Sequence, residues 1–120
     1  MAPDVAKRLL DALEAARRIC EFAGGKSAEQ FAQDALLRSA VERQFEIIGE
    51  ALGRAGAVEP QIAATIEDIP RIVGLRNRLI HGYDTVDDEI IWDIVQTKIP
   101  ALIGRLQESL EKEGYPSRTL

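Results

Sequence analysis

The sequence has few of the residues from which many active sites are built. Its 120 residues include one cysteine, one histidine and one tryptophan, and aromatic residues make up only 5%. Because Cys20 is alone, the sequence excludes an intrachain disulfide and a cysteine-based metal cluster. A single histidine, His81, without a cysteine partner argues against a zinc site. We therefore expect this protein to use neither a metal nor a cofactor.

A surplus of positive charge is also missing. Lys and Arg number 15 and Asp and Glu number 20, which gives a net charge of −5. Domains that bind nucleic acid mainly by neutralising phosphates are usually basic, so a broad basic surface is excluded while a local basic site is not. Long apolar runs are absent as well, and the charged, amphipathic start of the chain does not resemble a signal peptide. These features predict a cytoplasmic protein with no membrane partner.

Apolar residues recur with a helical period along nearly the whole chain, and no strand pattern is present. A first helix is expected over residues 5–20, ending at the paired glycines of "AGGK". Ser27 and Gln30 form a capping-box pattern, which predicts the start of a second helix. The apolar stripe of this helix ends before Gly53 and Gly56.

Two prolines divide the middle of the chain. Pro60 and Pro70 confine the segment between them to a short helical turn between loops. A third helix is predicted over residues 70–81, because proline is favoured in a first helical turn and Gly82 stands just past the end.

A fourth helix follows the acidic stretch "DTVDDE". Thr85 and Asp88 form its capping pair, and its apolar stripe reaches Leu110, with a kink or break expected at Pro100. The acidic stretch lacks the ordered ligand spacing of a calcium loop and suits the N-terminal end of a helix dipole.

These elements predict an all-α protein, a four- to five-helix up-down bundle. Residues 1–114 form a single domain, and residues 115–120 form a polar C-terminal tail. The helices carry broad apolar faces, yet aromatic residues are scarce. A thin bundle of this kind often completes its core with a second copy, so we expect a two-fold homodimer.

The scarce polar chemistry is concentrated in "LRNRLIHGYD", residues 75–84. The segment carries Arg76, Asn77, Arg78, His81 and Tyr83. Histidine titrates near neutral pH and can move a proton at a ribose 2′-hydroxyl, while arginine holds phosphate and stabilises its added charge. These residue types therefore suit metal-free RNA cleavage through a cyclic phosphate.

The helical phase of this segment matters for such a site. At about 100° per residue, Arg76 and His81 point about 140° apart on one regular helix, whereas Asn77 and His81 share a face. Arg76 and His81 therefore face one small target together only if the helix ends, which Gly82 suggests, or if a second copy supplies one of the pair. The alternative is structural: arginine and histidine are favoured at any helix C-terminus by the dipole, and Tyr83 then packs beneath the helix end.

The segment "RNRLIHGY" resembles the Arg-x4-His-x-Tyr motif of HEPN-superfamily ribonucleases, in the form carried by HepT-like toxins. The resemblance extends to "FEIIGEAL" in the second helix and to "VDDEIIWDIVQTKIPAL" after the motif. The start "RLLDALEAARRI" and the continuation "SAEQFAQDALLRSAVER" are similar too, so nearly the whole chain is covered.

The resemblance implies a role for each residue of the motif. Arg76 and His81 correspond to the catalytic pair, in a cleft at the dimer interface, and Asn77 supports them. Tyr83 corresponds to the tyrosine that receives AMP from a partner nucleotidyltransferase of the MNT type, the antitoxin. The implied substrate is RNA, either tRNA or mRNA, and the implied setting is a type II/VII-like toxin–antitoxin pair. Arg78 either contacts RNA or is exposed without a role.

Three residues outside the motif leave alternatives open. Glu46 and Glu50 lie one turn apart and either pair with Arg76 inside the bundle or are ordinary surface carboxylates. Trp92 falls in an apolar run, which favours a core position over an RNA-stacking platform. At the level of function, the alternative is a non-catalytic helical binding module or the substrate-presenting subunit of a nucleotidyltransferase, which would not require His81.

Overall fold

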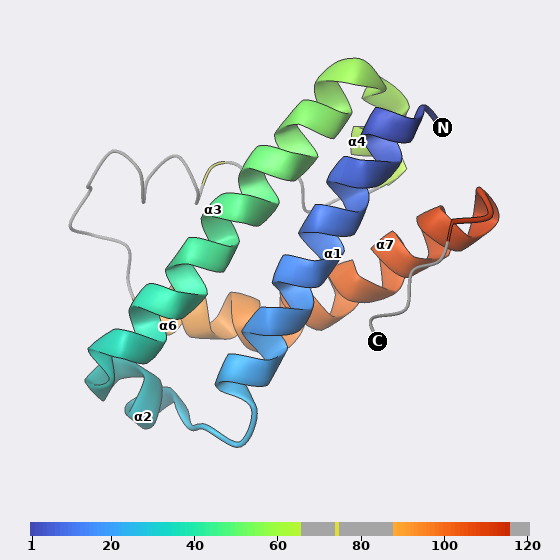
Figure 1. The fold of residues 1–120 in the computed structure, drawn as a ribbon. Coiled ribbons are helices and arrows are strands. Elements are labelled where there is room, and N and C mark those ends of the chain that lie inside the picture. The colour runs from blue at the N-terminus through green and yellow to red at the C-terminus, as the bar shows by residue number, and fades with distance from the viewer. Residues whose placement is uncertain (66–73, 75–87, 116–120) are drawn as a thin grey trace.

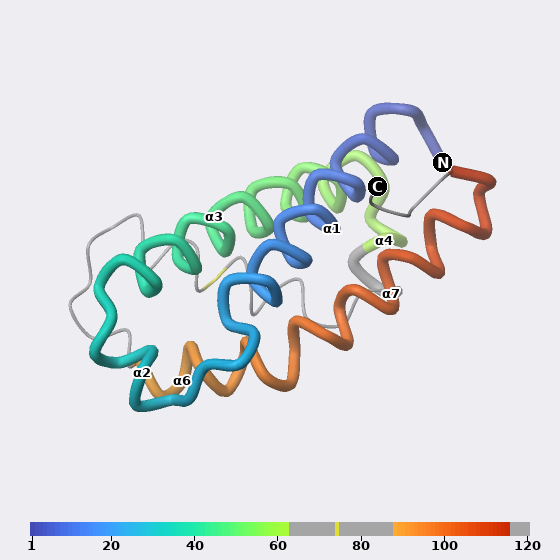
Figure 2. The backbone as a smooth tube through the Cα atoms, turned by 60° about the horizontal axis from the view of Figure 1, so that its bottom comes forward, coloured from blue at the N-terminus to red at the C-terminus, as the bar shows by residue number. Residues whose placement is uncertain are grey.

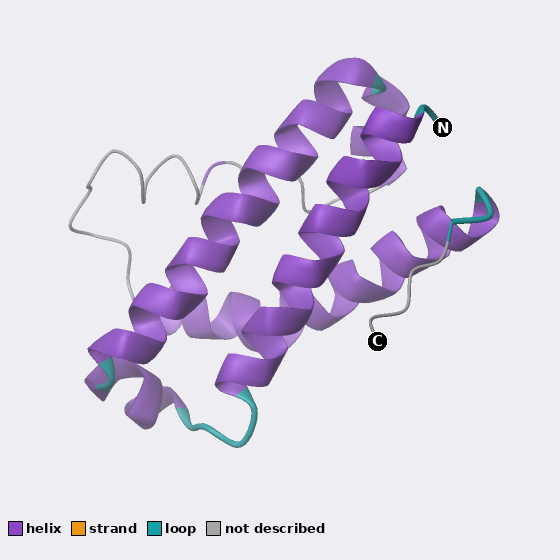
Figure 3. Ribbon diagram, in the orientation of Figure 1, coloured by secondary structure: helices purple, strands orange, loops and turns teal. Residues whose placement is uncertain are grey.

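The computed structural model describes residues 1–65, 74 and 88–115. Every element in this part of the chain is helical, which confirms the all-α prediction (Figure 3). The elements are α1 (Pro3–Ala23), α2 (Ala28–Gln33), α3 (Ala35–Val58), α4 (Pro60–Thr65), α6 (Asp88–Asp93), a π-helical turn η1 (Ile94–Lys98) and α7 (Ile99–Lys112).

The two longest helices, α1 and α3, lie side by side and run in opposite directions (Figure 1). The C-terminal helix α7 packs against α1 from another side, beneath it in Figure 2. The short helix α2 closes one end of the α1–α3 pair and contacts α6. Helix α1 is therefore the central element, with neighbours on both sides.

The core is made mainly of aliphatic side chains from α1, α3 and α7, with the buried rings of Phe31 and Phe45 and apolar residues of α6 and η1. On α1, the alanines Ala12, Ala15 and Ala16 are completely buried between larger residues. Small side chains allow the neighbouring helix backbones to approach closely, and the larger aliphatic residues fill the remaining space. Each fully buried leucine or isoleucine contributes about 1.5–3 kcal/mol relative to leaving it exposed. The apolar stripes of the sequence thus coincide with the buried faces.

The second predicted helix is in fact two helices. The capping box is confirmed, because the Ser27 hydroxyl accepts from the Gln30 N–H at 3.1 Å and the Gln30 Oε1 accepts from the Ser27 N–H at 2.8 Å. The prediction of one continuous helix is wrong, since Asp34 has an extended backbone and caps α3 by accepting from the Leu37 N–H at 3.0 Å. A short acidic side chain offers the backbone this alternative to helical bonding.

The end of this helix was also predicted too early. Helix α3 continues through both glycines, Gly53 and Gly56, to Val58, with Glu59 as the one residue between it and Pro60. Isolated glycines weaken a helix by only about 1 kcal/mol, which burial of the apolar face outweighs. The short helical turn expected after Pro60 is confirmed as α4.

The interruption expected near Pro100 takes the form of the π-helical turn. The Ile99 N–H bonds to the Ile94 carbonyl, one residue farther back than in an α-helix. Proline has no N–H and its ring clashes with the carbonyl four residues earlier, so a wider turn lets the chain pass without ending the helix. The helix therefore continues as α7.

The remaining predictions concern the chain's turns and tail. The first helix ends at the paired glycines, as predicted, with Gly25 at a φ of 74°. The third predicted helix, 70–81, lies outside the described residues apart from Gly74, which is helical. Gly82 and Thr85 also lie outside them. Tyr115, placed in the predicted tail, is half-buried against the core.

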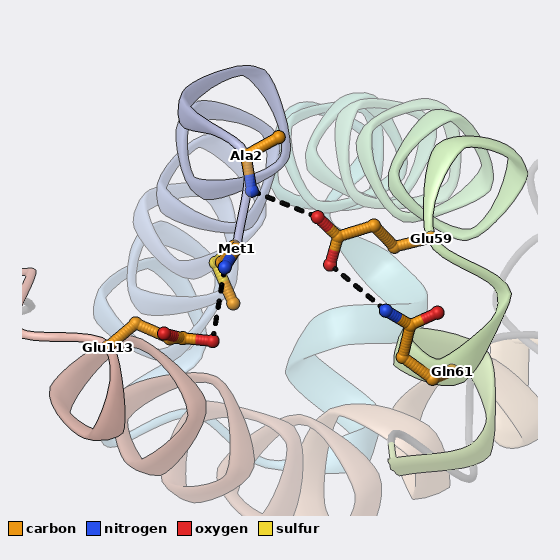
Figure 4. A network of polar contacts seen from close by, with 5 residues as sticks. All are labelled: Met1, Ala2, Glu59, Gln61 and Glu113. Atoms are coloured by element: carbon orange, nitrogen blue, oxygen red, sulfur yellow. Dashed lines mark hydrogen bonds and ion pairs between the residues drawn. The ribbon is translucent and has the colours of Figure 1, made fainter.

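Polar contacts join three elements at the end of the bundle away from α2 (Figure 4). The backbone N–H of Ala2 donates to Glu59 Oε1 at 2.9 Å, and the Met1 ammonium lies 3.3 Å from Glu113. Gln61 donates to the other oxygen of Glu59 at 3.5 Å.

Along the described parts of the chain, no helix has both the length and the apolar character needed to cross a bilayer.

Candidate functional site

The residues predicted to form a site all fall within residues 75–87, outside the described part of the chain. They are Arg76, Asn77, Arg78, His81 and Tyr83. Their arrangement therefore stays a prediction. The structure does describe the chain neighbours of this segment. Gly74 precedes it, helical and exposed, and Asp88 follows it directly as the first residue of α6.

Helix α6 is held against α2 by an aromatic pair. The ring centroids of Phe31 and Trp92 lie 5.2 Å apart, with the planes tilted by 37°. Phe31 is completely buried, as is Ile91 of α6. Trp92 is partly buried against the core, which confirms its predicted packing role. An aromatic pair of this kind adds about 0.5–1.5 kcal/mol beyond its buried area, so the C-terminal half of α6 is anchored against α2.

Arg38, on α3, connects α2 to α6. Its Nη1 donates to the carbonyl oxygens of Phe31, at 3.3 Å, and of Ala32. Its Nε lies 3.9 Å from Asp88 Oδ2. The guanidinium thus satisfies the Ala32 carbonyl at the C-terminal end of the short helix α2 and adds a second donor to the Phe31 carbonyl, which also accepts from the Asp34 N–H. It also places a positive charge beside the first residue of α6.

Two further carboxylates lie on the same side of α3 as Arg38. Glu42 and Glu46 follow it at four-residue intervals, so all three share one helix face. Burial raises the pKa of the Glu42 carboxyl, and the charges of Asp88 and Glu46 raise it further, while the nearby Arg38 lowers it. Arg38 therefore lies near two carboxylates, Glu42 of α3 and Asp88 of α6.

No motif in the sequence marks Arg38 or Glu42 as functional residues. Their spacing shows that they share a helix face, but their partner Asp88 lies far along the chain, so only the tertiary contact reveals the cluster. The two glutamates that the sequence did single out have local partners. Glu46 accepts from Arg43 at 3.1 Å and Glu50 from Arg54 at 3.1 Å. Both therefore have surface pairs on α3, and any contact with Arg76 lies outside the described residues.

A separate cavity of about 530 Å³ opens between the first turns of α1 and the last turns of α3. Its charged lining residues are Asp4, Lys7, Arg8, Asp11 and Arg54. Acidic and basic groups nearly balance there, and a lining of this kind does not favour a polyanion.

The described residues offer little other catalytic chemistry. Cys20 is half-buried, and burial raises the pKa of its thiol, which makes it a poor nucleophile. Within the described ranges, no group of three or more histidine, cysteine or acidic residues is arranged to hold a metal ion.

Comparison with known proteins supplies the family. The family described as "Ribonuclease HepT-like" matches residues 12–109, most of the chain. The chain belongs to the HepT-like ribonuclease family. The resemblance seen in the sequence is thereby confirmed, and the match contains all of the residues of the motif. Membership of this family makes the HepT-like ribonuclease an endoribonuclease, an enzyme that cleaves RNA.

Individual relatives agree with this membership. "Putative RNase MJ0127" of Methanocaldococcus jannaschii is 33% identical over 110 residues, covering 90% of this chain and 88% of the relative. "Putative RNase TTE0752" of Caldanaerobacter subterraneus subsp. tengcongensis is 36% identical over 100 residues, covering 78% and 87%. "Probable ribonuclease HepT" of Thermococcus cleftensis is 33% identical over 102 residues, covering 83% and 90%. No solved structure gives a significant match to this HepT-like ribonuclease.

Proposed function

We propose that this HepT-like ribonuclease is the toxin of a toxin–antitoxin pair. It cleaves RNA without a metal ion, at a site formed by Arg76 and His81, and is silenced when an MNT-type nucleotidyltransferase adds AMP to Tyr83. The observation that supports the proposal is the family match over residues 12–109, within which "RNRLIHGY" lies. The reaction belongs in the cytoplasm, where RNA and ATP are both available.

The chemistry follows from the residue types. The ribose 2′-hydroxyl loses its proton and attacks the adjacent phosphorus, and the 5′-oxygen leaves with a proton. The products are a cyclic phosphate and a free 5′-hydroxyl. His81 takes the proton from the 2′-hydroxyl or gives one to the leaving 5′-oxygen, because imidazole titrates near neutral pH. Arg76 holds the phosphate and stabilises the charge that develops on it, and Asn77 orients one of the two.

The geometry of a helix favours a site shared by two copies. On one regular helix, Arg76 and His81 point about 140° apart, so they do not face one small target together. A two-fold dimer that brings both segments to one cleft removes this difficulty. Arg78 adds positive charge to such a cleft, which an acidic protein needs in order to bind RNA locally.

Modification of Tyr83 silences the enzyme for a steric and electrostatic reason. Tyr83 stands two residues after His81, so an AMP group on it occupies the RNA cleft. The negative phosphate also repels the RNA backbone, as phosphorylation does at other sites.

The first test is RNA cleavage by the purified chain in excess EDTA, beside the His81→Ala and Arg76→Ala variants. Intact mass first establishes that Tyr83 is unmodified. We expect cleavage of total RNA by the parent alone, leaving cyclic-phosphate ends. Unchanged helical content in both variants, measured by circular dichroism, excludes misfolding. An unmodified parent dimer that leaves total RNA and tRNA intact would favour the non-catalytic binding module instead.

A second test asks whether two copies share one site. The His81→Ala chain is mixed with the Arg76→Ala chain, refolded together, and assayed for RNA cleavage. If each site takes its arginine from one copy and its histidine from the other, the mixed dimer regains one complete site, although each variant alone is inactive. Analytical ultracentrifugation confirms the dimer. Absence of any recovered activity in verified mixed dimers argues for a site within a single chain.

The third test concerns the modification, and the chain offers a matched control, because it has only two tyrosines. The Tyr83→Phe and Tyr115→Phe variants are each incubated with an MNT-type nucleotidyltransferase and ATP. We expect the mass increase of AMP on the Tyr115→Phe variant and none on the Tyr83→Phe variant. AMP on Tyr83→Phe, or on neither variant, counts against the proposed silencing.

A further inference from the structure

Arg38 joins the consecutive helices α2 and α3 to α6, which lies far along the sequence. From α3 it donates to the Phe31 and Ala32 carbonyl oxygens of α2, and it lies beside the Asp88 carboxylate of α6. Its side chain is only 27% exposed, so solvent screens these contacts less than it screens a free surface pair. A planar guanidinium can make several such contacts at once in a fixed geometry.

Electrostatics give this arginine a second role. Glu42 and Glu46 lie along the same face of α3, and Asp88 of α6 is close enough to Glu42 for its charge to act on that carboxyl. Burial and the two neighbouring carboxylates raise the pKa of Glu42, and Arg38 lowers it. Without Arg38, Asp88 would keep its like-charged neighbour Glu42 and lose the cation that lies beside it. Repulsion between the Asp88 and Glu42 carboxylates opposes the placement of the first residue of α6 beside α3.

The position of Asp88 in the chain connects this junction to the reaction. Asp88 directly follows residues 75–87, which carry every residue of the proposed site. His81 stands seven residues before it and Tyr83 five. Whatever holds Asp88 therefore fixes one end of the segment from which the catalytic histidine comes.

We propose that Arg38 is a positioning residue of the ribonuclease, which acts through Asp88 and does not touch RNA. Its contacts to α2 fix the guanidinium, and the guanidinium fixes the start of α6. The proposal rests on the proposed function, since it assigns His81 to the chemistry. Small displacements of catalytic groups lower the rate of the chemical step, even when the changed residue lies far from the chemistry.

The test compares kcat and KM for RNA cleavage in EDTA among matched variants. Arg38→Ala should lower kcat about ten-fold, within the range caused by misplacement of a catalytic group. KM should change by less than about two-fold, because the removed interaction does not bind substrate. Arg38→Lys keeps the charge and should recover part of kcat. Arg43→Ala removes the same charge from the same helix at an exposed position, and should keep the parent's kcat.

A double-mutant cycle shows whether Arg38 acts through Asp88. If it does, Arg38→Ala in an Asp88→Ala background should lower kcat far less than it does in the parent, because the shared contact is already lost. Circular dichroism and melting temperature confirm that each variant is folded at the assay temperature.

The outcomes separate the two proposals. If the parent cleaves RNA and Arg38→Ala keeps the parent's kcat, the positioning role is wrong and the ribonuclease mechanism stands. Equal losses in Arg38→Ala and Arg43→Ala, or fully multiplicative losses in the cycle, overturn it too, since they indicate a general charge effect or an independent one. If the unmodified parent does not cleave RNA, the proposed function fails, and the positioning role fails with it.

Discussion

Gln44 is the one polar side chain of the described core, and replacing it should stabilise the protein. It lies on the buried face of α3, only 9% exposed. Its Oε1 is buried and has no hydrogen-bond partner among the described residues. An unsatisfied buried acceptor costs about 1–3 kcal/mol, because it gives up its bond to water and gains none in return. Gln44→Met keeps the length and helix propensity of the side chain while it removes the polar atoms.

We therefore expect Gln44→Met to raise the free energy of unfolding by about 1–3 kcal/mol. For a chain of this length, each kcal/mol corresponds to about 4 °C in melting temperature. Urea unfolding at one fixed protein concentration, followed by circular dichroism, measures the change. The slope against urea should stay the same, since the buried area does not change.

Two matched variants sharpen this test. Gln33→Met makes the same replacement at an exposed position on α2 and should shift stability by less than about 0.5 kcal/mol. Gln44→Glu should destabilise the protein, because a buried carboxylate loses more hydration than an amide does. If Gln44→Met matches the Gln33→Met control or destabilises the fold, the Oε1 atom has a partner and the reasoning is refuted.

Three further predictions concern the described residues. Glu42 has a raised pKa in the folded state, so the folded protein binds more protons and the carboxylate opposes folding above that pKa. Glu42→Gln should thus stabilise the protein at pH 7, by less than about 1 kcal/mol because solvent screens a half-exposed group. This gain should vanish in thermal melts as the pH falls through the usual glutamate range; a gain that grows on acidification would contradict it. Cys20 should be alkylated by iodoacetamide at pH 8 more slowly in the native chain than in urea, because burial raises the pKa of its thiol. Asp34→Ala should destabilise α3 by about 1 kcal/mol, a loss visible in urea unfolding, because the Leu37 N–H loses its cap.

Local features of the sequence decided much of the helical structure. The capping box at Ser27, the paired glycines after α1 and the short turn after Pro60 each depend on residues within one or two turns. The apolar stripes likewise predict which faces are buried, because their period is that of the helix. Family membership also followed from the sequence, since the motif and its flanking segments are continuous stretches of chain.

Helix boundaries differ from those that the sequence predicts where local preferences compete with one another. Asp34 has neighbours with a regular helical stripe, yet its side chain caps the next helix and divides the predicted one in two. At Gly53 and Gly56 the reverse happens, because burial of the surrounding apolar face outweighs the weak helix propensity of glycine. Near Pro100 the sequence predicts an interruption, but not that one widened turn lets the helix continue.

By itself, the sequence determined the all-α class, most helix starts, and a candidate catalytic segment with its residues in order. The tertiary structure alone decided which distant groups meet. Arg38 and Asp88 are separated by most of α3 and everything up to α6, and no local pattern pairs them. Gln44 reads as an ordinary helix residue, and only packing reveals that its oxygen is buried without a partner. The physical reason is the same in both cases: helix formation depends on neighbours in sequence, whereas burial and charge pairing depend on neighbours in space.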